Sequence, residues 1–343
     1  MKKILITGIT GQDGTFLTKS LLQEGCLVYG ISRYNNNLFK KRLSSLGVNN
    51  FDNLKIINLN LLNLGVVEKF LNDIKPNFVY NLSGPSSVYR SLKDPNLANQ
   101  IETIFDNLTT GLKLNNNLCS FFQASSSEMF DINDCNIGLN ENSRFKPRNP
   151  YSKAKLRNHR KVLKLNSQLG WEIKSGILFN HESEFRNGEF LIPKLVVSAK
   201  NIKNKSVKNV EIGSLQYKRD WSFAGDIVDA IKLITENSKS SDYVVGRGNS
   251  NSIKDLLDII FGYHKLNWED FIVVNPKILR NNDPKEIFSN PKKIKKDLNW
   301  KPKVSFEDGV KKILDNINYW KDAPLWNKKN IKSATKTWFK YMK

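Results

Sequence analysis

Three glycines spaced three residues apart follow the first apolar run of the chain. They lie in the segment TGITGQDGTFL, directly after a strand predicted at Lys3–Thr7. Glycine at the first two positions permits a tight turn and the close approach of a pyrophosphate, and the third lets the next helix pack against the strand. We therefore predict a dinucleotide-binding turn; a purely structural glycine-rich turn is the alternative. Its residues are Gly8, Ile9, Thr10, Gly11, Gln12, Asp13 and Gly14.

Short apolar strands alternate with amphipathic helices over the first 180 residues. Predicted strands lie at Lys3–Thr7, Leu27–Ile31, Lys55–Leu59, Phe78–Leu82, Ser120–Ala124 and Lys174–Leu178, and predicted helices at about 14–24, 65–74, 98–115 and 151–168. This alternation is typical of an α/β fold with a Rossmann-type, doubly wound parallel sheet. We expect residues 1–180 to form the nucleotide-binding domain, with a later segment at about 217–245 returning to it. Residues 181–343 should form mostly a smaller, mixed α/β substrate lobe.

The chain is strongly basic, with 54 Lys and Arg against 33 Asp and Glu and a formal net charge of +21. A positive balance favours anionic ligands. The lysines are spread through segments such as SAKNIKNK and PKKIKKDL, so we expect a polyanionic small molecule and no nucleic acid. No run approaches 18 apolar residues, which predicts no membrane span. Cys26, Cys119 and Cys135 lack metal-ligand spacing, which predicts reduced thiols, a cytoplasmic location and no metal site.

The end of the second predicted strand bears on the choice between NAD and NADP. NAD sites usually place an acidic residue there, which binds the ribose hydroxyls. In the segment YGISRYNNN the first charged residue is Arg33, and a guanidinium can pair a 2′-phosphate in a bidentate manner. The sequence therefore favours NADP over NAD. A solvated arginine at the start of a loop is the alternative.

A tyrosine and a lysine are expected on one face of a helix in the segment PYSKAK. Pro150 suits the first position of a helix, so Tyr151 and Lys155 lie four residues apart on the same face. A tyrosine hydroxyl has a pKa of about 10, and a nearby ammonium lowers this pKa toward a useful acid–base range. The lysine can also hold the nicotinamide ribose. The pair predicts acid–base chemistry beside the cofactor.

The apolar strand in NLCSFFQASSSEMF ends in three hydroxyls and a carboxylate. If the chain stays extended from Ser120 to Glu128, alternating side chains place Ser126 and Glu128 on the same side. The Ser126 hydroxyl can then share a substrate oxygen with Tyr151. Hydride transfer alone does not need a carboxylate, so Glu128 indicates a second proton transfer, such as an elimination.

Seven segments occur together and in order: ITGITGQDGTFL, VYNLSGPSSVYRSL, QASSSEMF, RNPYSKAK, GILFNHES, IGSLQYKRDW and PKKIKKDLNWKP. With them the chain resembles the extended short-chain dehydrogenase/reductase superfamily, and specifically the GDP-mannose 4,6-dehydratases, over roughly residues 1–320. The resemblance implies a hydro-lyase with tightly bound NADP. Such an enzyme converts GDP-mannose, or a related GDP-sugar, to the 4-dehydro-6-deoxy product by internal hydride transfer and loss of water. It also implies a homodimer or homotetramer.

The same resemblance assigns roles to individual residues. Ser126, Tyr151 and Lys155 become the catalytic triad, with Ser126 where the family usually has threonine, and Glu128 becomes the dehydratase carboxylate. For the cofactor the resemblance implies, besides the glycine turn, Arg33, Asn60, Leu61, Leu82, Ser83, Gly84, Ser86, Tyr151, Lys155, His181 and Arg186. For the substrate it implies Ser86, Ser126, Asn180, Lys194, Arg219 and Arg280.

Departures from the family pattern leave alternatives open. Asn60 stands where the family commonly has an aspartate near the adenine, and Tyr34 replaces a second arginine after Arg33, which weakens the preference for NADP. An epimerase or a 4-keto reductase would use the same turn, tyrosine and lysine without needing Glu128. A non-catalytic nucleotide or nucleic-acid binding protein would show no turnover.

Overall fold

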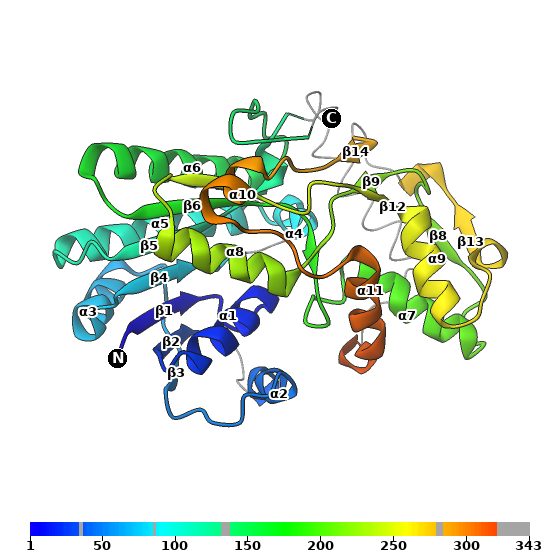
Figure 1. Cartoon of the computed structure of the whole chain (residues 1–343), viewed down its shortest axis with the longest axis horizontal. Coiled ribbons are helices and arrows are strands. Elements are labelled where there is room, and N and C mark those ends of the chain that lie inside the picture. Colours follow the sequence, from blue (N-terminus) through cyan, green and yellow to red (C-terminus); the bar gives the residue numbers. More distant parts are fainter. Residues whose placement is uncertain (34–36, 85–86, 132–137, 279–283, 321–343) are drawn as a thin grey trace.

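Seven parallel strands form the central sheet of the computed structural model, which describes residues 1–33, 37–84, 87–131, 138–278 and 284–320 (Figure 1). In spatial order they are β11 (Asp242–Val245), β6 (Ile173–Leu178), β5 (Ser120–Ser126), β4 (Phe78–Asn81), β1 (Lys3–Thr7), β2 (Leu27–Ile31) and β3 (Leu54–Ile57). The strand order reverses between β1 and β4, where a doubly wound sheet binds its ligand. The predicted Rossmann-type α/β fold is confirmed.

Helices cover both faces of this sheet (Figure 1). Along β1 the side chains alternate: Ile4 and Ile6 pack toward one face and Leu5 toward the other, as the period of two in a strand requires. The first face packs against α1 (Gln12–Gln23), α2 (Asn37–Ser45) and α8 (Ala224–Asn237). The second packs against α3 (Leu64–Ile74), α5 (Asn96–Leu114) and α6 (Pro150–Leu169). Burial on both faces explains why these strands are continuous apolar runs.

The elements of this region that were not predicted include α2, α8 and β11. The helix α2 was missed, although Phe39 and Leu43 recur at helical spacing and are both buried. The strand β11 was also missed, and it pairs with β6 at the edge of the sheet. The other strands agree with prediction to within two residues.

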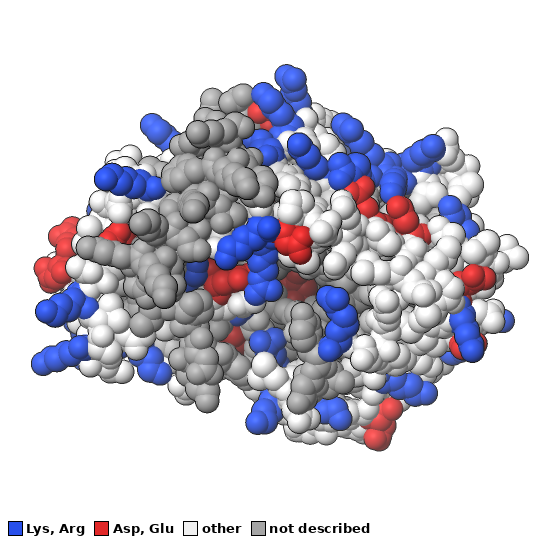
Figure 2. All heavy atoms as spheres, turned by 180° about the vertical axis from the view of Figure 1, so that it is seen from behind, with Lys and Arg blue, Asp and Glu red and all other residues white. Residues whose placement is uncertain are grey.

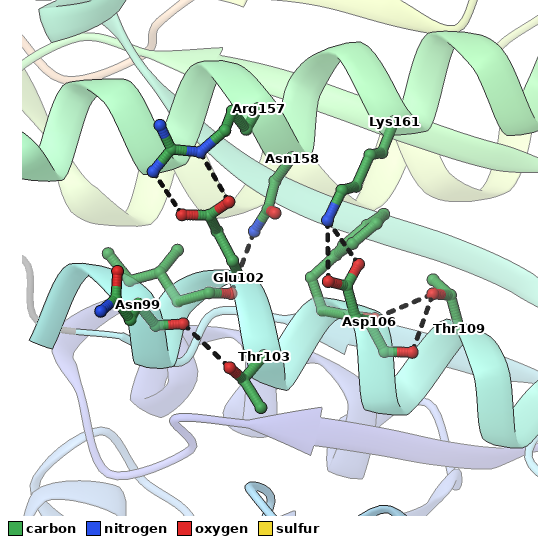
Figure 3. A network of polar contacts seen from close by, with 10 residues as sticks. Asn99, Glu102, Thr103, Asp106, Thr109, Arg157, Asn158 and Lys161 are labelled. Carbon is green, nitrogen blue, oxygen red and sulfur yellow. Dashed lines mark hydrogen bonds and ion pairs between the residues drawn. The ribbon is translucent and has the colours of Figure 1, made fainter. Parts of the chain in front are cut away.

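Charged pairs join α5 and α6 on their outer side (Figure 3). Arg157 holds Glu102 in a bidentate pair at 2.6 and 2.5 Å, and Lys161 lies 2.7 Å from Asp106. Between these pairs, the buried Asn158 donates to the carbonyl oxygen of Ile101 at 3.0 Å. These bonds set the position of α6, and with it the position of the tyrosine and lysine near its start.

The remaining elements build a second core. Apolar side chains of α7 (Leu191–Lys203), α9 (Ile253–Tyr263) and α11 (Phe306–Asp315) pack together with β8 (Val210–Ile212) and Trp221. Short strands complete this part: β8 pairs with β13 (Ile272–Val274), and β9 (Lys218–Arg219) pairs with β12 (Asn251–Ser252) and β14 (Glu286–Ile287). Two further strands, β7 (His181–Glu182) and β10 (Ser222–Phe223), pair beside the carboxyl end of β6. Also described are α4 (Val88–Lys93) and α10 (Lys292–Leu298).

The positive charge is dispersed on the face of the molecule that Figure 2 draws. Figure 2 shows one face, on which Lys and Arg side chains lie in separate groups with Asp and Glu between them. This view agrees with the spread of lysines along the sequence. Within the described ranges, every helix is too short or too polar to cross a bilayer.

Candidate active site

The turn between β1 and α1 has the geometry that its glycines predict. Gly11 N donates to Gly8 O at 3.0 Å, and Gly11 is the N-cap residue of α1. Gly8 has φ +72°, and a Cβ there would lie 2.8 Å from Leu82 O, so the end of β4 passes directly beside the turn. A Cβ on Gly14 would lie 2.4 Å from Ile9 O, so glycine is needed for the helix to begin this close to the strand. Because Gly11 offers no side-chain cap, the first N–H groups of α1 suit the pyrophosphate of a dinucleotide.

Buried polar side chains connect this turn to α6. Thr7 Oγ1 donates to Asn81 Oδ1 at 2.6 Å, and Asn81 Nδ2 donates to Gln123 Oε1 at 2.7 Å. Gln123 Nε2 and Lys155 Nζ then donate to the same Ala124 O, at 2.9 and 2.8 Å. The chain of bonds runs across β1, β4 and β5 and fixes Lys155 relative to the turn. Sequence analysis missed Asn81 and Gln123, although polar residues inside apolar strands were an available signal.

His181 and Asp13 form an ion pair at the same edge. The ring nitrogens of His181 lie 2.7 Å from Phe179 O and 3.0 Å from Asp13 Oδ1. Burial alone would lower the pKa of His181, but the negative charge of Asp13 has the larger effect, so the pKa of His181 is raised. Burial alone would raise the pKa of Asp13, but the interaction with His181 has the larger effect, so the pKa of Asp13 is lowered. Gln12 Nε2 also donates to His181 O at 3.0 Å. The imidazolium neutralises a carboxylate that would otherwise repel an anion at the start of α1.

Two arginines follow β2 in the chain, and one of them, Arg42, was not predicted. Arg33 is exposed, two residues beyond the end of β2. Arg42 lies on α2 and donates from Nη1 to Thr10 O at 3.0 Å, and its guanidinium lies 5.5 Å from the centroid of the Phe185 ring. Arg42 therefore holds the backbone of the turn. Its role was missed because α2 was missed.

The tyrosine and lysine lie at the start of α6, as predicted. Asn149 caps the helix, because its Oδ1 accepts from Ser152 N at 2.8 Å, and Pro150 occupies the first helical position. Tyr151 and Lys155 are both buried, and Lys155 Nζ lies 5.7 Å from the centroid of the Tyr151 ring. The pair thus faces the carboxyl end of β5.

The expected lowering of the tyrosine pKa is wrong for this structure. Burial raises the pKa of Tyr151 to about 12, a hydrogen bond with Ser126 lowers it, and the charge of Glu128 raises it further. Lys155 instead gives its hydrogen bond to a backbone carbonyl. The hydrogen bond with Ser126 and the effect of the Glu128 charge show that these two residues lie close to Tyr151.

Lys155 gives a pH-dependent prediction for stability. Burial lowers its pKa from 10.5 to about 8, so between these values the unfolded chain binds a proton that the folded protein has released. The free energy of unfolding should therefore rise with pH in this window, relative to a Lys155→Met variant, by up to about 1.4 kcal/mol per pH unit. Urea denaturation of both proteins from pH 8 to 10.5 measures this difference. A difference independent of pH would contradict the burial of this ammonium.

The strand β5 ends at Ser126, so the condition of an extended chain from Ser120 to Glu128 is not met. The residues Ser127–Met129 form a 3₁₀ turn, η1, and Ser126 Oγ accepts from Glu128 N at 3.3 Å. A serine hydroxyl that binds the N–H two residues ahead favours a turn over continued strand. The predicted alternation holds up to this point, because Ser125 turns away and bonds to Ser175 at 2.9 Å.

The other predicted cofactor residues lie at the carboxyl edge of the sheet or close to it. Asn60 and Leu61 follow β3, and Leu82, Ser83 and Gly84 follow β4. Ser83 Oγ donates to Asn81 Oδ1 at 3.0 Å, which joins it to the buried polar chain. Arg186 Nε lies 3.3 Å from Glu182 Oε2, and its guanidinium lies 3.5 Å from the centroid of the Phe190 ring. Ser86 falls outside the described residues.

The predicted substrate residues are more widely spread. Asn180 lies between β6 and β7, and its carbonyl accepts from Ser222 N at 2.9 Å. Lys194 is half-buried on α7. Arg219, on β9, donates from Nη1 to Lys218 O and Pro284 O at 2.7 and 3.0 Å. Arg280 lies outside the described residues.

Comparison with known proteins connects this site to one family. A family model described as GDP-mannose 4,6 dehydratase matches residues 5–313, a range that includes the glycine turn and the segment from Ser126 to Lys155. The chain is 35% identical over 323 residues to GDP-mannose 4,6 dehydratase 1 of Arabidopsis thaliana, a match that covers 92% of this chain and 89% of that protein.

Solved structures show a similar fold. One is dTDP-glucose 4,6-dehydratase from Bacillus anthracis in complex with NAD (TM-score 0.77, 18% identity, 94% of this chain and 97% of that one). Another is RMD from Pseudomonas aeruginosa complexed with NADPH (TM-score 0.76, 19% identity, 92% of this chain and 99% of that one). At these identities the similarity concerns the fold alone.

Proposed function

Because the chain belongs to the GDP-mannose 4,6 dehydratase family, we propose that it converts GDP-mannose to GDP-4-dehydro-6-deoxymannose and water. The observation that carries this proposal is the position of Glu128. Its carboxylate lies in the turn after Ser126 and acts electrostatically on Tyr151. Oxidation at C4 needs the two hydroxyl groups but no carboxylate. Removal of a proton from the carbon next to the new ketone needs a base at this place.

Each group of the site has a defined role in this scheme. Tyr151, ionised for this step, takes the proton of the C4 hydroxyl, while Ser126 holds O4 by a hydrogen bond; the positive charge of an oxidised nicotinamide would lower the pKa that burial raises. A bound nicotinamide cofactor would supply the hydride acceptor for C4 and the hydride donor for C6. The ketone makes the C5 hydrogen acidic; Glu128 removes it as a proton and protonates the departing C6 hydroxyl, which leaves as water. The proton that Tyr151 took from the C4 hydroxyl balances the one that is added to C5, which completes the product.

We propose NADP as the cofactor, bound by the glycine turn, the residues that follow β3 and β4, and His181. Lys155 would hold the nicotinamide ribose. Arg33 supports NADP over NAD because its exposed guanidinium follows β2 directly, where this fold places the adenosine ribose. Arg42 is already bonded to the turn backbone and would serve either cofactor.

Arg33→Ala should weaken NADP binding about tenfold or more, because a charge-assisted hydrogen bond is worth roughly 1.5–3 kcal/mol. NAD binding should stay within about twofold, since NAD lacks the 2′-phosphate. Arg42→Ala is the matched contrast and should weaken both cofactors alike, because it loosens the turn that both require. Isothermal titration with each cofactor measures these constants. Equal losses of NADP and NAD in Arg33→Ala would remove the NADP proposal.

The GDP-sugar is proposed to bind on the side of the second core, which we assign mostly to residues 181–343. Asn180, Lys194 and Arg219 would contact the nucleotide or its diphosphate, and Arg280 joins them by resemblance. Assembly as a homodimer or homotetramer and a cytoplasmic location stay predictions.

Incubation with GDP-mannose, without added NADPH, tests the proposed reaction. Mass spectrometry should show a product lighter than the substrate by one water, and a carbonyl reagent should trap it. An epimerase would give a GDP-sugar of unchanged mass, and a 4-keto reductase would give no product. Either result would replace the dehydratase proposal.

A further inference from the structure

The side chain of Asn149 binds two different partners. It is 2% exposed, and its Oδ1 accepts from Ser152 N at 2.8 Å to cap α6. At the other end of the amide, Nδ2 lies 3.4 Å from Glu128 Oε2. The cap requires an oxygen, so it fixes the orientation of the amide and turns the NH₂ group toward the carboxylate. The NH₂ group at this position can donate a hydrogen bond to the carboxylate of Glu128.

Backbone pairing holds these two residues near each other. Residues 129–131 and 144–146 run antiparallel and are joined by backbone hydrogen bonds of 2.8 and 2.9 Å. Glu128 precedes the first of these segments and Asn149 follows the second. The paired backbone segments therefore hold Glu128 and Asn149 close enough for their side chains to contact each other.

We propose that Asn149 is the positioning residue of the elimination step. One amide caps the helix that carries Tyr151 and also holds one oxygen of Glu128, so the tyrosine and the carboxylate keep a fixed separation while protons move at both. The second carboxylate oxygen, Oε1, then serves the C5 proton. The inference rests on the proposed function for the role of Glu128, whereas the contact itself does not depend on the substrate.

An Asn149→Asp variant isolates the N–H donor. Aspartate keeps the cap acceptor and the shape of asparagine, but it directs a second carboxylate at Glu128, whose charge also acts on Tyr151. We expect kcat to fall roughly ten- to a hundredfold, less than the 10²–10⁴ for loss of the base itself, with KM within about twofold. The acidic limb of the kcat profile should move to higher pH, because neighbouring carboxylates bind a proton more readily.

Two further variants control this experiment. Asn149→Ser also keeps a cap, but its shorter side chain cannot reach Glu128 as the amide does, so kcat should fall while the shift of the pH profile is absent. It also replaces the aspartate variant if that one does not fold. Asn63→Asp makes the same change at the cap of α3, where Asn63 Oδ1 accepts from Val66 N at 3.1 Å. It should leave kcat and the pH profile unchanged.

A double-mutant cycle separates this inference from the proposed function, because thermal unfolding needs no substrate. At neutral pH, Asn149→Asp should lower the melting temperature by about 2 °C or more when Glu128 is present. It should not do so in the Glu128→Gln background, where the glutamine amide can donate to the new carboxylate. Absence of coupling, or an unchanged kcat and pH profile in Asn149→Asp, would overturn the inference. Failure of the parent to release a ketone would refute the proposed function, and the cycle would still decide whether Asn149 holds Glu128.

Discussion

A Tyr151→Phe variant is expected to release no ketone from GDP-mannose, with kcat at least about 10²–10⁴-fold below that of the parent. The substitution removes one oxygen atom and leaves the ring in its buried position, where Tyr151 is 8% exposed. Ser126 can still bind O4, but an ordinary alcohol is too weak a base to take the C4 proton. Reduced nicotinamide should therefore fail to appear when enzyme and GDP-mannose are mixed. Single-turnover absorbance of the reduced cofactor measures this step directly.

The loss of activity in Tyr151→Phe should come from the missing hydroxyl and not from a change in the fold. Tyr243→Phe is the matched control, because it removes the hydroxyl of another buried tyrosine. Tyr243 lies on β11, an edge strand of the sheet, and its hydroxyl donates to Asp297 Oδ2 at 3.1 Å. It should keep kcat near the parental value, and both variants should unfold cooperatively. If Tyr151→Phe still oxidised C4, the tyrosine and lysine of α6 would be structural and the active site would lie elsewhere.

The fold was largely predictable because local and long-range requirements agree in this chain. A strand that is buried on both faces must be apolar throughout, and each crossover between parallel strands must be long enough for a helix. These constraints placed β1, β2 and the helix that begins at Pro150 close to their observed bounds. The missed helix α2 carries its apolar residues at helical spacing, but its many polar residues made this short stretch resemble a loop.

The position of the candidate site at one edge of the sheet was predictable for a related reason. Parallel strands end at the same edge of a sheet, so polar residues after β1, β4 and β5 must come near one another. The family assignment confirms the resemblance that motifs at these strand ends indicated. What the pattern could not give was the local conformation after Ser126, where a hydroxyl binds its own backbone and turns the chain.

Contacts between distant segments were beyond sequence reasoning. Asn149 stands in the predicted segment RNPYSKAK, yet nothing local indicates that its amide reaches Glu128, 21 residues earlier. Arg42 reaches Thr10 across 32 residues in the same way. The pKa of Tyr151 was also misjudged, because spacing on a helix gives the nearby ammonium but not the burial that dominates this pKa.

The Glu128→Gln variant should separate oxidation from elimination. Glutamine has nearly the same shape and can still accept from Asn149 Nδ2, so cofactor and GDP-sugar binding should stay within a few-fold of the parent. Tyr151 and Ser126 are untouched, and the first hydride transfer should proceed. The amide cannot remove the C5 proton, so dehydration should fall by about 10²–10⁴. Rapid mixing should show reduced nicotinamide accumulating, while mass spectrometry finds no loss of water.

Glu141→Gln is the matched control for this experiment. Glu141 is also a partly buried glutamate, its Oε1 accepts from Val244 N at 2.7 Å, and burial raises its pKa. Removing its charge should cost stability without changing the ratio of oxidation to dehydration, because its carboxylate binds the backbone of an edge strand. If Glu128→Gln instead released the dehydrated ketone at a near-parental rate, Glu128 could not be the base. A chain with an intact Tyr151 and a dispensable carboxylate would then match an epimerase or a 4-keto reductase better than a dehydratase.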